Sequence, residues 1–259
     1  MQLMLFHEIV FGPIKSRRLG ISLGINLLPT SGKICTFDCI YCECGYNADG
    51  RTKQGFPPRE TVAQALKAKL QELKSSGITP DVITFSGNGE PTLHPEFESI
   101  IDDTIEFRNK YFPQAKISVL SNSTMIDKES VFRALNKIDN NILKLDSVFD
   151  DSAKLIDQPL QSSFSVTKLI ENLKRFKGNL IIQTIFLKGV HNGQYIDNTN
   201  EEEVNAWINV LKEINPKQVM IYTIDRATPE KNLQKISLEE LNIIAKKLKK
   251  AGFDVSVSG

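Results

Sequence analysis

The chain has 259 residues, of which 41% are hydrophobic and 24% charged, a composition typical of a globular protein with a substantial core. Lys and Arg number 32 against 31 Asp and Glu, so the net charge of +1 gives no general reason to expect a nucleic acid or a membrane as partner. The sequence contains neither an apolar run of 18 residues nor a charged-then-apolar leader. We therefore expect a cytoplasmic protein without a membrane partner, and we also expect a monomer.

Hydrophobic periodicity predicts strands and helices in alternation along most of the chain. The first 20 residues are mixed in character and include a basic cluster at Lys15, Arg17 and Arg18. The strands that we predict after them are 22–28, 81–85, 116–120, 142–146, 180–187 and 218–224, with a short last one at 253–257. The helices that we predict are 59–75, 95–110, 128–137 capped by Asp127, one opened by Ser165, and two marked by the capping boxes Thr199–Glu202 and Ser237–Glu240.

Six strand–helix repeats with continuously apolar strands favour a parallel sheet joined by right-handed crossovers. Two α/β architectures satisfy this pattern, a doubly wound open sheet and a full or partial (β/α) barrel. No stretch of the sequence has the composition of a linker. We therefore predict one domain over residues 1–259, with an N-terminal extension at 1–20 and a core at about 21–257.

All four cysteines lie within ten residues, at Cys35, Cys39, Cys42 and Cys44, just after the first predicted strand. Thiols gathered on one loop indicate an iron–sulfur cluster, a structural zinc ion or a local disulfide. A reducing compartment disfavours the disulfide. Structural zinc usually joins two separated ligand pairs, and the rest of the chain offers neither another Cys nor a His pair. The spacing of the first three cysteines suits a cluster, and three thiolates would leave one iron open for chemistry.

Polar residues follow the predicted strands at the end where parallel α/β folds bind their ligands. They are Ser86-Gly87, Ser121-Asn122, Asp146-Ser147 and the run Tyr222–Arg226. Ser and Asn at such positions also start turns, so a ligand contact is one of two interpretations. Lys144 and Asp146 either form a buried ion pair or present an acid to a ribose hydroxyl. Gln183, in an apolar strand, is either a hydrogen-bonding core residue or a pocket residue.

The pattern Cys35-x3-Cys39-x2-Cys42, with Tyr41 before the third cysteine, resembles the signature of the radical S-adenosylmethionine (radical SAM) superfamily. The turn Gly87-Asn88-Gly89-Glu90-Pro91 is similar to the family's glycine-glutamate-proline turn. This resemblance implies a partial (β/α)6 TIM-like barrel, with the cluster loop after the first strand. It also implies that Cys35, Cys39 and Cys42 hold one [4Fe–4S] cluster, which cleaves S-adenosylmethionine to methionine and a 5′-deoxyadenosyl radical.

The same resemblance suggests which residues bind S-adenosylmethionine. It places the Gly87–Glu90 turn, including Asn88 and Gly89, at the methionine amino group, and Tyr41 near the adenine. Ser121 and Asn122 would lie near the methionine or ribose, and Asp146 and Ser147 near the ribose. Cys44 has no counterpart in the signature, so an incidental thiol, a fourth ligand in the absence of S-adenosylmethionine and a substrate-side group all stay open. The enzyme is expected to be oxygen-sensitive and to need a flavodoxin- or ferredoxin-like one-electron donor.

The flanking segments Phe11–Gly20, Lys144–Asp146 and Ile156–Pro159 resemble a small single-cluster branch of the family, which also resembles the wyosine-forming tRNA enzymes and the activating enzymes. The substrate is therefore open between a protein or peptide, a small molecule, and a tRNA base bound by Lys15, Arg17, Arg18 and Lys246–Lys250. Our substrate-side candidates, from their expected position on the rim, are Arg17, Arg18, Gln183, Tyr222 and Arg226. A different class of protein, a non-catalytic binding module stabilised by zinc, is the remaining alternative.

Overall fold

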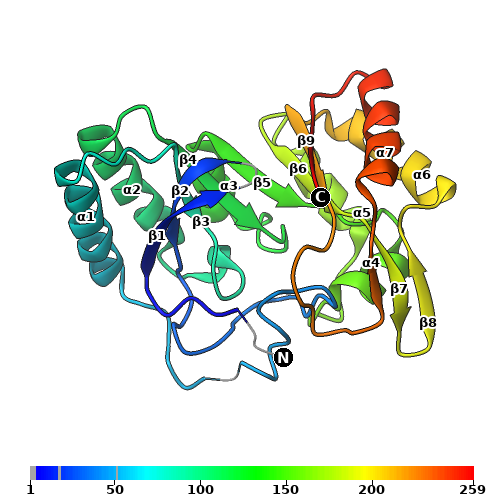
Figure 1. Cartoon of the computed structure of the whole chain (residues 1–259), viewed down its shortest axis with the longest axis horizontal. Helices are drawn as coiled ribbons and strands as arrows, with labels where there is room; N and C mark the ends of the chain where they lie inside the picture. The colour runs from blue at the N-terminus through cyan, green and yellow to red at the C-terminus, as the bar shows by residue number, and fades with distance from the viewer. Residues whose placement is uncertain (1–3, 17–18, 51) are drawn as a thin grey trace.

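The structure is a computed structural model that describes residues 4–16, 19–50 and 52–259. A curled eight-stranded sheet has helices on its outer face and forms a half-barrel (Figure 1). Its strands are β1 (Val10–Ser16), β2 (Gly20–Ile25), β3 (Val82–Phe85), β4 (Lys116–Ser121), β5 (Asn140–Lys144), β6 (Ile181–Ile185), β9 (Gln218–Tyr222) and β11 (Val255–Ser258). The helices are α1 (Arg59–Ser75), α2 (Phe97–Tyr111), α3 (Glu129–Asn136), α4 (Asp150–Asp157), α5 (Val166–Lys174), α6 (Glu201–Ile214) and α7 (Leu238–Lys250), with a short 3-10 turn η1 (Pro91–Leu93).

The order of the strands decides between the two architectures that the sequence left open. The sheet runs β1-β2-β3-β4-β5-β6-β9-β11, and the neighbours from β2 onward are parallel. In a doubly wound sheet the order of the strands would reverse at a switch point, whereas here each new parallel strand is added at the same edge of the sheet. The prediction of a partial TIM-like barrel is therefore confirmed.

Three features of the fold were not expected from the sequence: strand β1, helix α4 and a second small sheet. β1 pairs antiparallel with β2, so the segment predicted as an extension contributes a strand to the sheet. α4 occupies a segment where no element was predicted, because its buried apolar residues, Ala153 and Ile156, are too few to display a helical period. The predicted strand 180–187 ends early, and its last residue begins β7 (Leu187–His191), which pairs with β8 (Gln194–Asp197) and β10 (Leu233–Lys235) in a second, small sheet.

Local capping signals were partly right. The Ser237–Glu240 capping box of α7 is present, with both reciprocal hydrogen bonds. The Thr199–Glu202 box is wrong by one residue, because the side chain of Asn200 accepts the hydrogen bond from the Glu203 amide. Asp127 does not cap α3, which begins after Lys128 without a side-chain cap. Adjacent polar residues compete for the cap position, and packing of the helix decides which residue occupies it.

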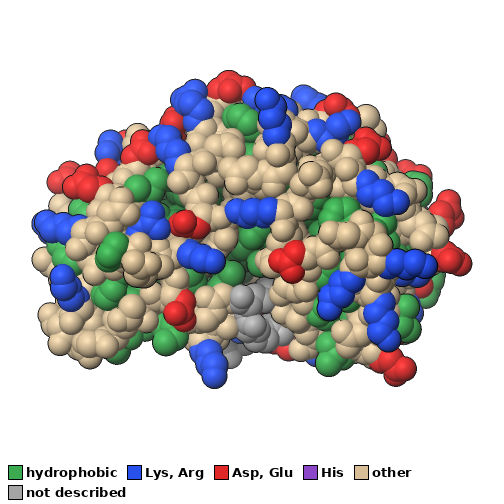
Figure 2. Space-filling model, turned by 90° about the horizontal axis from the view of Figure 1, so that it is seen from above, with side chains coloured by type: hydrophobic (Ala, Val, Ile, Leu, Met, Phe, Trp, Pro, Cys, Tyr) green, Lys and Arg blue, Asp and Glu red, His purple; other side chains and the backbone are tan. Residues whose placement is uncertain are grey.

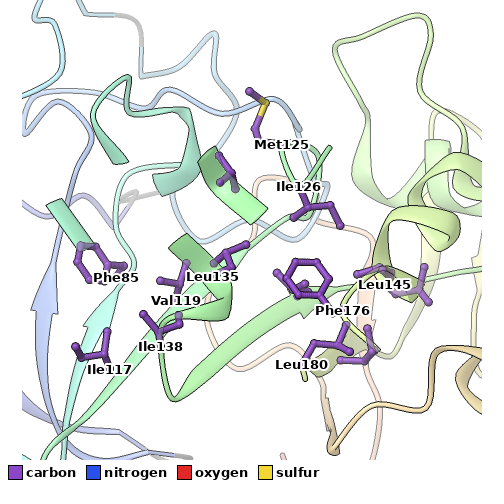
Figure 3. Close-up of a cluster of buried hydrophobic side chains, with 14 of the residues drawn as sticks. Phe85, Ile117, Val119, Met125, Ile126, Leu135, Ile138, Leu145, Phe176 and Leu180 are labelled. Carbon is purple, nitrogen blue, oxygen red and sulfur yellow. The ribbon is translucent and has the colours of Figure 1, made fainter. Parts of the chain in front are cut away.

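The two faces of the sheet differ in character. Ile117 and Val119 of β4 point toward the helices and lie with Leu135 of α3, Phe176 and Leu180 in a continuous apolar layer (Figure 3). The alternate residues face the inside of the half-barrel, where Leu120 and Gln183 line cavities. This alternation follows from the two-residue period of a strand. The interior face of the sheet is therefore available for a binding site.

The outer surface carries both signs of charge. Figure 2 shows Lys and Arg side chains interspersed with Asp and Glu on the face that it draws. Among the described residues, no helix is both long and apolar enough to span a membrane.

Candidate functional site

A cavity of about 280 Å³ opens at the carboxyl ends of the parallel strands, and we call it the thiol cavity. All four cysteines line it, together with residues from the ends of β3, β4, β5, β6 and β9. The loop that contributes the thiols, residues 33–47, follows β2, which is the first parallel strand but the second strand of the chain. In Figure 1 the segment between β2 and α1 runs along the bottom of the view. The fold thus brings together groups that are far apart in sequence.

Asn47 holds the thiol loop in shape from within. Its side-chain oxygen accepts a hydrogen bond from the Cys35 amide at 2.9 Å, and its side-chain nitrogen donates to the Phe37 carbonyl at 3.0 Å. The Asp38 carboxylate accepts from both the backbone and the side-chain nitrogen of Asn47, at 2.6 and 2.8 Å. The Asn47 side chain therefore joins the start of the loop to its end. It also provides hydrogen-bond partners for backbone groups that have none in a helix or strand.

The end of α4 holds the other side of the thiol loop. The Ile40 amide donates to the Ile156 carbonyl at 3.0 Å, and the Asp38 amide donates to the Asp157 and Gln158 carbonyls at 3.1 and 3.0 Å. An isolated antiparallel bridge joins Phe37 to Pro159. The last turn of α4 and the residues just after it, Ile156–Pro159, thus support the loop that carries the cysteines.

The glycine turn after β3 forms a third support. The Ile34 amide donates to the Asn88 carbonyl at 3.0 Å, and the Glu90 amide donates to the Ile34 carbonyl at 3.1 Å. Gly89 has φ of +133°, and a Cβ atom there would lie 1.9 Å from the Ile34 carbonyl oxygen. Only glycine permits this close approach of the two backbones.

Glu90 is buried within this turn, and its carboxylate is extensively hydrogen-bonded. One oxygen accepts from the Thr92 amide at 3.0 Å and the Thr92 hydroxyl at 2.5 Å, while the other accepts from the Asn122 amide at 2.6 Å. Burial nevertheless raises the pKa of Glu90. The carboxylate therefore joins the turn to the end of β4 while still lining the thiol cavity.

Two lysines lie beside the thiols, Lys33 buried and Lys144 partly buried with 15% of its side chain exposed. Lys33, whose side chain is 1% exposed, donates to the Gly45 carbonyl at 2.5 Å, and its Nζ lies 3.5 Å from an Asp38 carboxylate oxygen. Lys144, at the end of β5, places its Nζ 3.2 Å from the Cys39 sulfur. Burial works against charge at Lys144, yet the nearby Cys39 and Asp157 raise the pKa of its ammonium. The loop is therefore flanked by positive charge on two sides.

The four thiols have different acidities. Burial raises the pKa of Cys35 to about 11 and that of Cys39 well above its usual value. The pKa of Cys42 falls to about 5, first because the Cys44 thiol hydrogen-bonds to it, and also because the Lys33 ammonium is near. The same hydrogen bond raises the pKa of Cys44. Cys42 is therefore the thiol most ready to lose its proton.

The structure gathers most of the site residues predicted from sequence around the thiol cavity. Its lining includes Cys35, Cys39, Cys42, Tyr41, Gly87, Gly89, Glu90, Ser121, Asn122, Gln183, Tyr222 and Arg226. The side-chain nitrogen of Asn122 lies 3.4 Å from the Cys35 sulfur. Arg226 pairs with Glu43 at 2.6 Å and is half exposed. Arg17 and Arg18 lie outside the described residues.

Three predicted ligand residues lie behind the cavity wall. Asn88 donates to the Phe6 and Pro29 carbonyls, each at 2.8 Å. Ser147 donates to the carboxylate of Glu203 at 2.8 Å. Asp146 accepts from the Tyr41 hydroxyl at 2.5 Å and from the Ile185 amide at 3.0 Å, and its ion pair with Lys144 spans 3.5 Å. The structure shows Asp146 in the ion pair with Lys144, where it also holds the Tyr41 hydroxyl of the cavity wall, and its contact with a ribose hydroxyl stays a prediction.

Sequence reasoning missed Lys33, Asn47 and Asp157. Each lies in an irregular stretch or in the unpredicted helix α4, where periodicity gives no orientation. The only signal for Lys33 in the sequence was its position two residues before Cys35. Asp157 receives a hydrogen bond from the Cys39 thiol at 3.5 Å, and burial raises its pKa to about 8.

A second cavity, of about 340 Å³, lies inside the half-barrel and shares Gln183, Leu120, Glu43, Asp225 and Arg226 with the thiol cavity. Gln183 is 9% exposed and stands in register between Lys144 of β5 and Met220 of β9. No hydrogen bond of its side chain to the described residues is found. Ser22, Thr84, Ser86 and Lys15 contribute polar groups to this second cavity. It lies next to the thiols and has room for a small ligand or a side chain.

The donor set of the thiol cavity fits an iron–sulfur cluster. Three thiols on one loop face a shared cavity, and the two nearby ammonium groups favour the thiolate form that ligation requires. Glu90 and the backbone of the glycine turn lie on the same wall and offer acceptors for an ammonium group. Among the described residues, no three His, Cys, Asp or Glu side chains are grouped so as to hold a single metal ion.

Comparison with solved structures shows which fold this is. SuiB of Streptococcus suis, in a structure with S-adenosylmethionine bound, superimposes with a TM-score of 0.65 and 14% identity over 91% of this chain and 50% of that one. TYW1, in a structure with a lysine-pyruvate adduct, gives a TM-score of 0.59 and 16% identity over 88% of this chain and 73% of that one. At sequence identities this low, the similarity shows a shared fold only.

Curated sequences give closer relatives. A UPF0026 protein of Helicobacter pylori (strain ATCC 700392 / 26695) is 34% identical over 238 residues, which cover 90% of this chain and 71% of that protein. The chain spans about a third of the length of a Brachyspira hyodysenteriae protein named GTPase Obg, to which it is 31% identical over 235 residues. The model of the radical SAM superfamily matches residues 30–202, more than half of the chain. The protein therefore belongs to the radical SAM superfamily.

Proposed function

We propose that this protein is a radical SAM enzyme in which Cys35, Cys39 and Cys42 hold one [4Fe–4S] cluster. The observation that carries the proposal is the presence of these three thiols on one cavity, beside a Gly-x-Gly-Glu turn hydrogen-bonded to the same loop. Bound together, the cluster and S-adenosylmethionine supply a 5′-deoxyadenosyl radical that abstracts hydrogen from a substrate. This chemistry makes the protein an enzyme rather than a zinc-stabilised binding module.

The residues of the chain divide the binding of S-adenosylmethionine among them. Gly87, Gly89 and Glu90 offer backbone carbonyls and a carboxylate to the methionine ammonium group. Tyr41 presents its ring to the adenine, and Asp146 fixes that ring by accepting its hydroxyl hydrogen bond. Ser121 and Asn122 offer polar groups to the methionine or the ribose, while Asn88 and Ser147 hold the surrounding turns in place.

Cys44 is not among the proposed ligands. It follows Cys42 by two residues, hydrogen-bonds to it and lies 3.5 Å from the Gly87 carbonyl oxygen. It also lies outside the Cys-x3-Cys-x2-Cys pattern whose three thiols are the proposed ligands. We therefore place Cys44 beside the cluster as a thiol that does not bind iron.

The size and place of the second cavity favour a small molecule, or one side chain of a peptide, as the substrate. Its volume of about 340 Å³ is in the range of small-ligand sites and adjoins the thiol cavity through Gln183. Gln183 offers an amide to a polar group of the substrate, with Tyr222 and Arg226 at the shared wall. A one-electron donor such as flavodoxin or ferredoxin completes the reaction.

A tRNA base is the second candidate substrate, and the fold likeness to TYW1 is what supports it. The near-zero net charge and the interspersed surface charges give it no further support (Figure 2). A steep loss of tRNA affinity as salt is raised would favour it, whereas no binding near physiological salt would remove it.

Anaerobic reconstitution with iron and sulfide tests the proposal. The reduced protein should convert S-adenosylmethionine to 5′-deoxyadenosine, and Cys39→Ala should lose both the brown chromophore and this product. Cys44→Ala is the matched control within the same loop and should keep both. A parent protein that contains zinc but no chromophore, or a Cys39→Ala protein that behaves like the parent, would contradict the proposal.

A further inference from the structure

We propose that the ammonium groups of Lys33 and Lys144, which lie against the thiol loop, raise the reduction potential of the cluster site. This inference rests on the proposed function, because it concerns the charge around the three cysteine ligands. Bound to a cluster as thiolates, Cys35, Cys39 and Cys42 would concentrate negative charge on the thiol loop, and each lysine places its ammonium group against this loop from a different side. Their role is electrostatic, and neither residue is assigned to the hydrogen-abstraction step.

Lys33 approaches the thiols from within their own loop. Its backbone amide donates to the Gly50 carbonyl at 2.9 Å, and its Nζ donates to the Gly45 carbonyl at 2.5 Å. The nearest carboxylate, on Asp38, lies 3.5 Å from Nζ. With 1% of its side chain exposed, Lys33 cannot reach solvent as a surface lysine does, so its charge acts on the loop.

Lys144 approaches from the inner face of the sheet. Its Nζ lies 3.2 Å from the Cys39 sulfur, 3.4 Å from an Asp157 oxygen and 3.5 Å from an Asp146 oxygen. The same atom lies 4.7 Å from the centre of the Tyr41 ring. These contacts hold the ammonium group at the cavity wall rather than in bulk water.

One-electron reduction adds one negative charge to the site, and a fixed positive charge nearby favours that change. The Coulomb energy between two charges grows as the effective dielectric constant falls, so it is larger for buried groups than for exposed ones. Glu43, Glu90, Asp225 and Arg226 also line the cavity, but the Arg226 guanidinium is half exposed and paired with Glu43. Among the described residues of the cavity lining, Lys33 and Lys144 are thus the least exposed cations, with 1% and 15% of their side chains exposed.

An EPR-monitored potentiometric titration of the anaerobically reconstituted full chain tests the inference. Lys33→Met and Lys144→Met, which keep the length of the side chain but remove its charge, should each lower the midpoint potential. A change of about tenfold in the one-electron equilibrium corresponds to about 59 mV. Asp38→Asn removes a negative charge but keeps an acceptor for Asn47, so it should shift the potential upward.

Lys217→Met is the matched control. Lys217 also donates to a backbone carbonyl, that of Asp139, but it lies at the opposite end of the strands, before β9. Its substitution should leave the midpoint potential unchanged. If Lys33 had only a structural role, Lys33→Met would lower the iron content or the thermal stability, and the midpoint potential of the fraction that still holds a cluster would stay the same.

The outcomes separate this inference from the proposed function. If the parent protein holds no [4Fe–4S] signal, the proposed function fails. If the parent holds the cluster and both Met variants titrate at the parent potential, only the electrostatic role of the lysines is overturned. If the Met variants bind no iron, the Asp38→Asn protein decides, because an unchanged potential there also overturns the inference.

Discussion

The helix-side core and the thiol cavity lie on opposite faces of the same strands and are built in opposite ways. The helix-side core, which includes Ile117, Val119, Leu135, Phe176 and Leu180, consists of apolar side chains in close contact (Figure 3). The thiol cavity is lined by thiols, carboxylates, amides and lysines, and its loops are held by individual hydrogen bonds. Stability therefore comes mainly from one face, and the chemistry belongs to the other.

This difference has a physical reason. Apolar packing is non-directional and tolerates modest changes as long as volume is conserved, whereas a buried polar network fails when one partner is lost. Substitutions in the helix-side core should therefore change global stability without a specific effect on the thiols. Substitutions around the thiol cavity should instead change the thiol site, with a smaller effect on global stability.

The largest effect on stability is expected for Phe176→Ala. Phe176 is 2% exposed and packs against Phe132, with ring centroids 4.7 Å apart, so its removal leaves a cavity and should cost about 3–5 kcal/mol of unfolding free energy. Urea denaturation of the protein without cluster measures this cost. Phe176→Leu is the control and should lose less. If Phe176→Ala lowered the unfolding free energy by less than about 1 kcal/mol, the helix-side core would not be the main source of stability.

Gly89→Ala should disturb the cavity more than the fold. The added Cβ would meet the Ile34 carbonyl at 1.9 Å, so the turn must move away from the thiol loop, at a cost of about 1–3 kcal/mol. Calorimetric titration with S-adenosylmethionine should show weaker binding to the reconstituted protein. Gly77→Ala is the matched control, since Gly77 also has positive φ, +68°, but open space around it. Equal effects of the two changes on binding would contradict the role of the turn.

Asn47→Ala should loosen the thiol loop locally. It removes the side-chain partner of Cys35, Phe37 and Asp38, whose contacts with Asn47 are only part-buried, so we expect a cost of about 1 kcal/mol in all. We expect the iron content after reconstitution to fall while the main unfolding transition moves little. Asn200→Ala, which removes the cap of α6, should lower stability by about 1 kcal/mol and leave iron content unchanged. The opposite pattern would place the loop within the global folding unit.

The smallest effect is expected at Glu203, which lies behind the cavity wall. Burial raises the pKa of Glu203 in the folded protein above its unfolded value. Its contribution to stability is therefore present below the unfolded pKa and is lost as pH rises through the folded value. Glu203→Gln keeps an acceptor for Ser147 and should be relatively more stable at pH 8 than at pH 4. Urea unfolding of both proteins at each pH measures this, and a pH-independent difference would contradict it.

Much of this protein followed from the sequence by itself. Long apolar periods predicted α1, α2 and the parallel strands, since periodicity reports which face of an element is buried. The spacing of Cys35, Cys39 and Cys42 and the glycine turn indicated the family, because ligand type and spacing are properties of a short segment. These predictions depend on local information only.

The tertiary structure decided what depends on contacts between distant segments. The strand order that selects the half-barrel over a doubly wound sheet is set by packing, as are the pairing of β1 and the support of the thiol loop by α4. The burial of Lys33 beside Asp38 and the position of the Lys144 ammonium group beside Cys39 are likewise tertiary results. A lysine in a sequence is by default a solvated charge, and only the surrounding chain can exclude water from it.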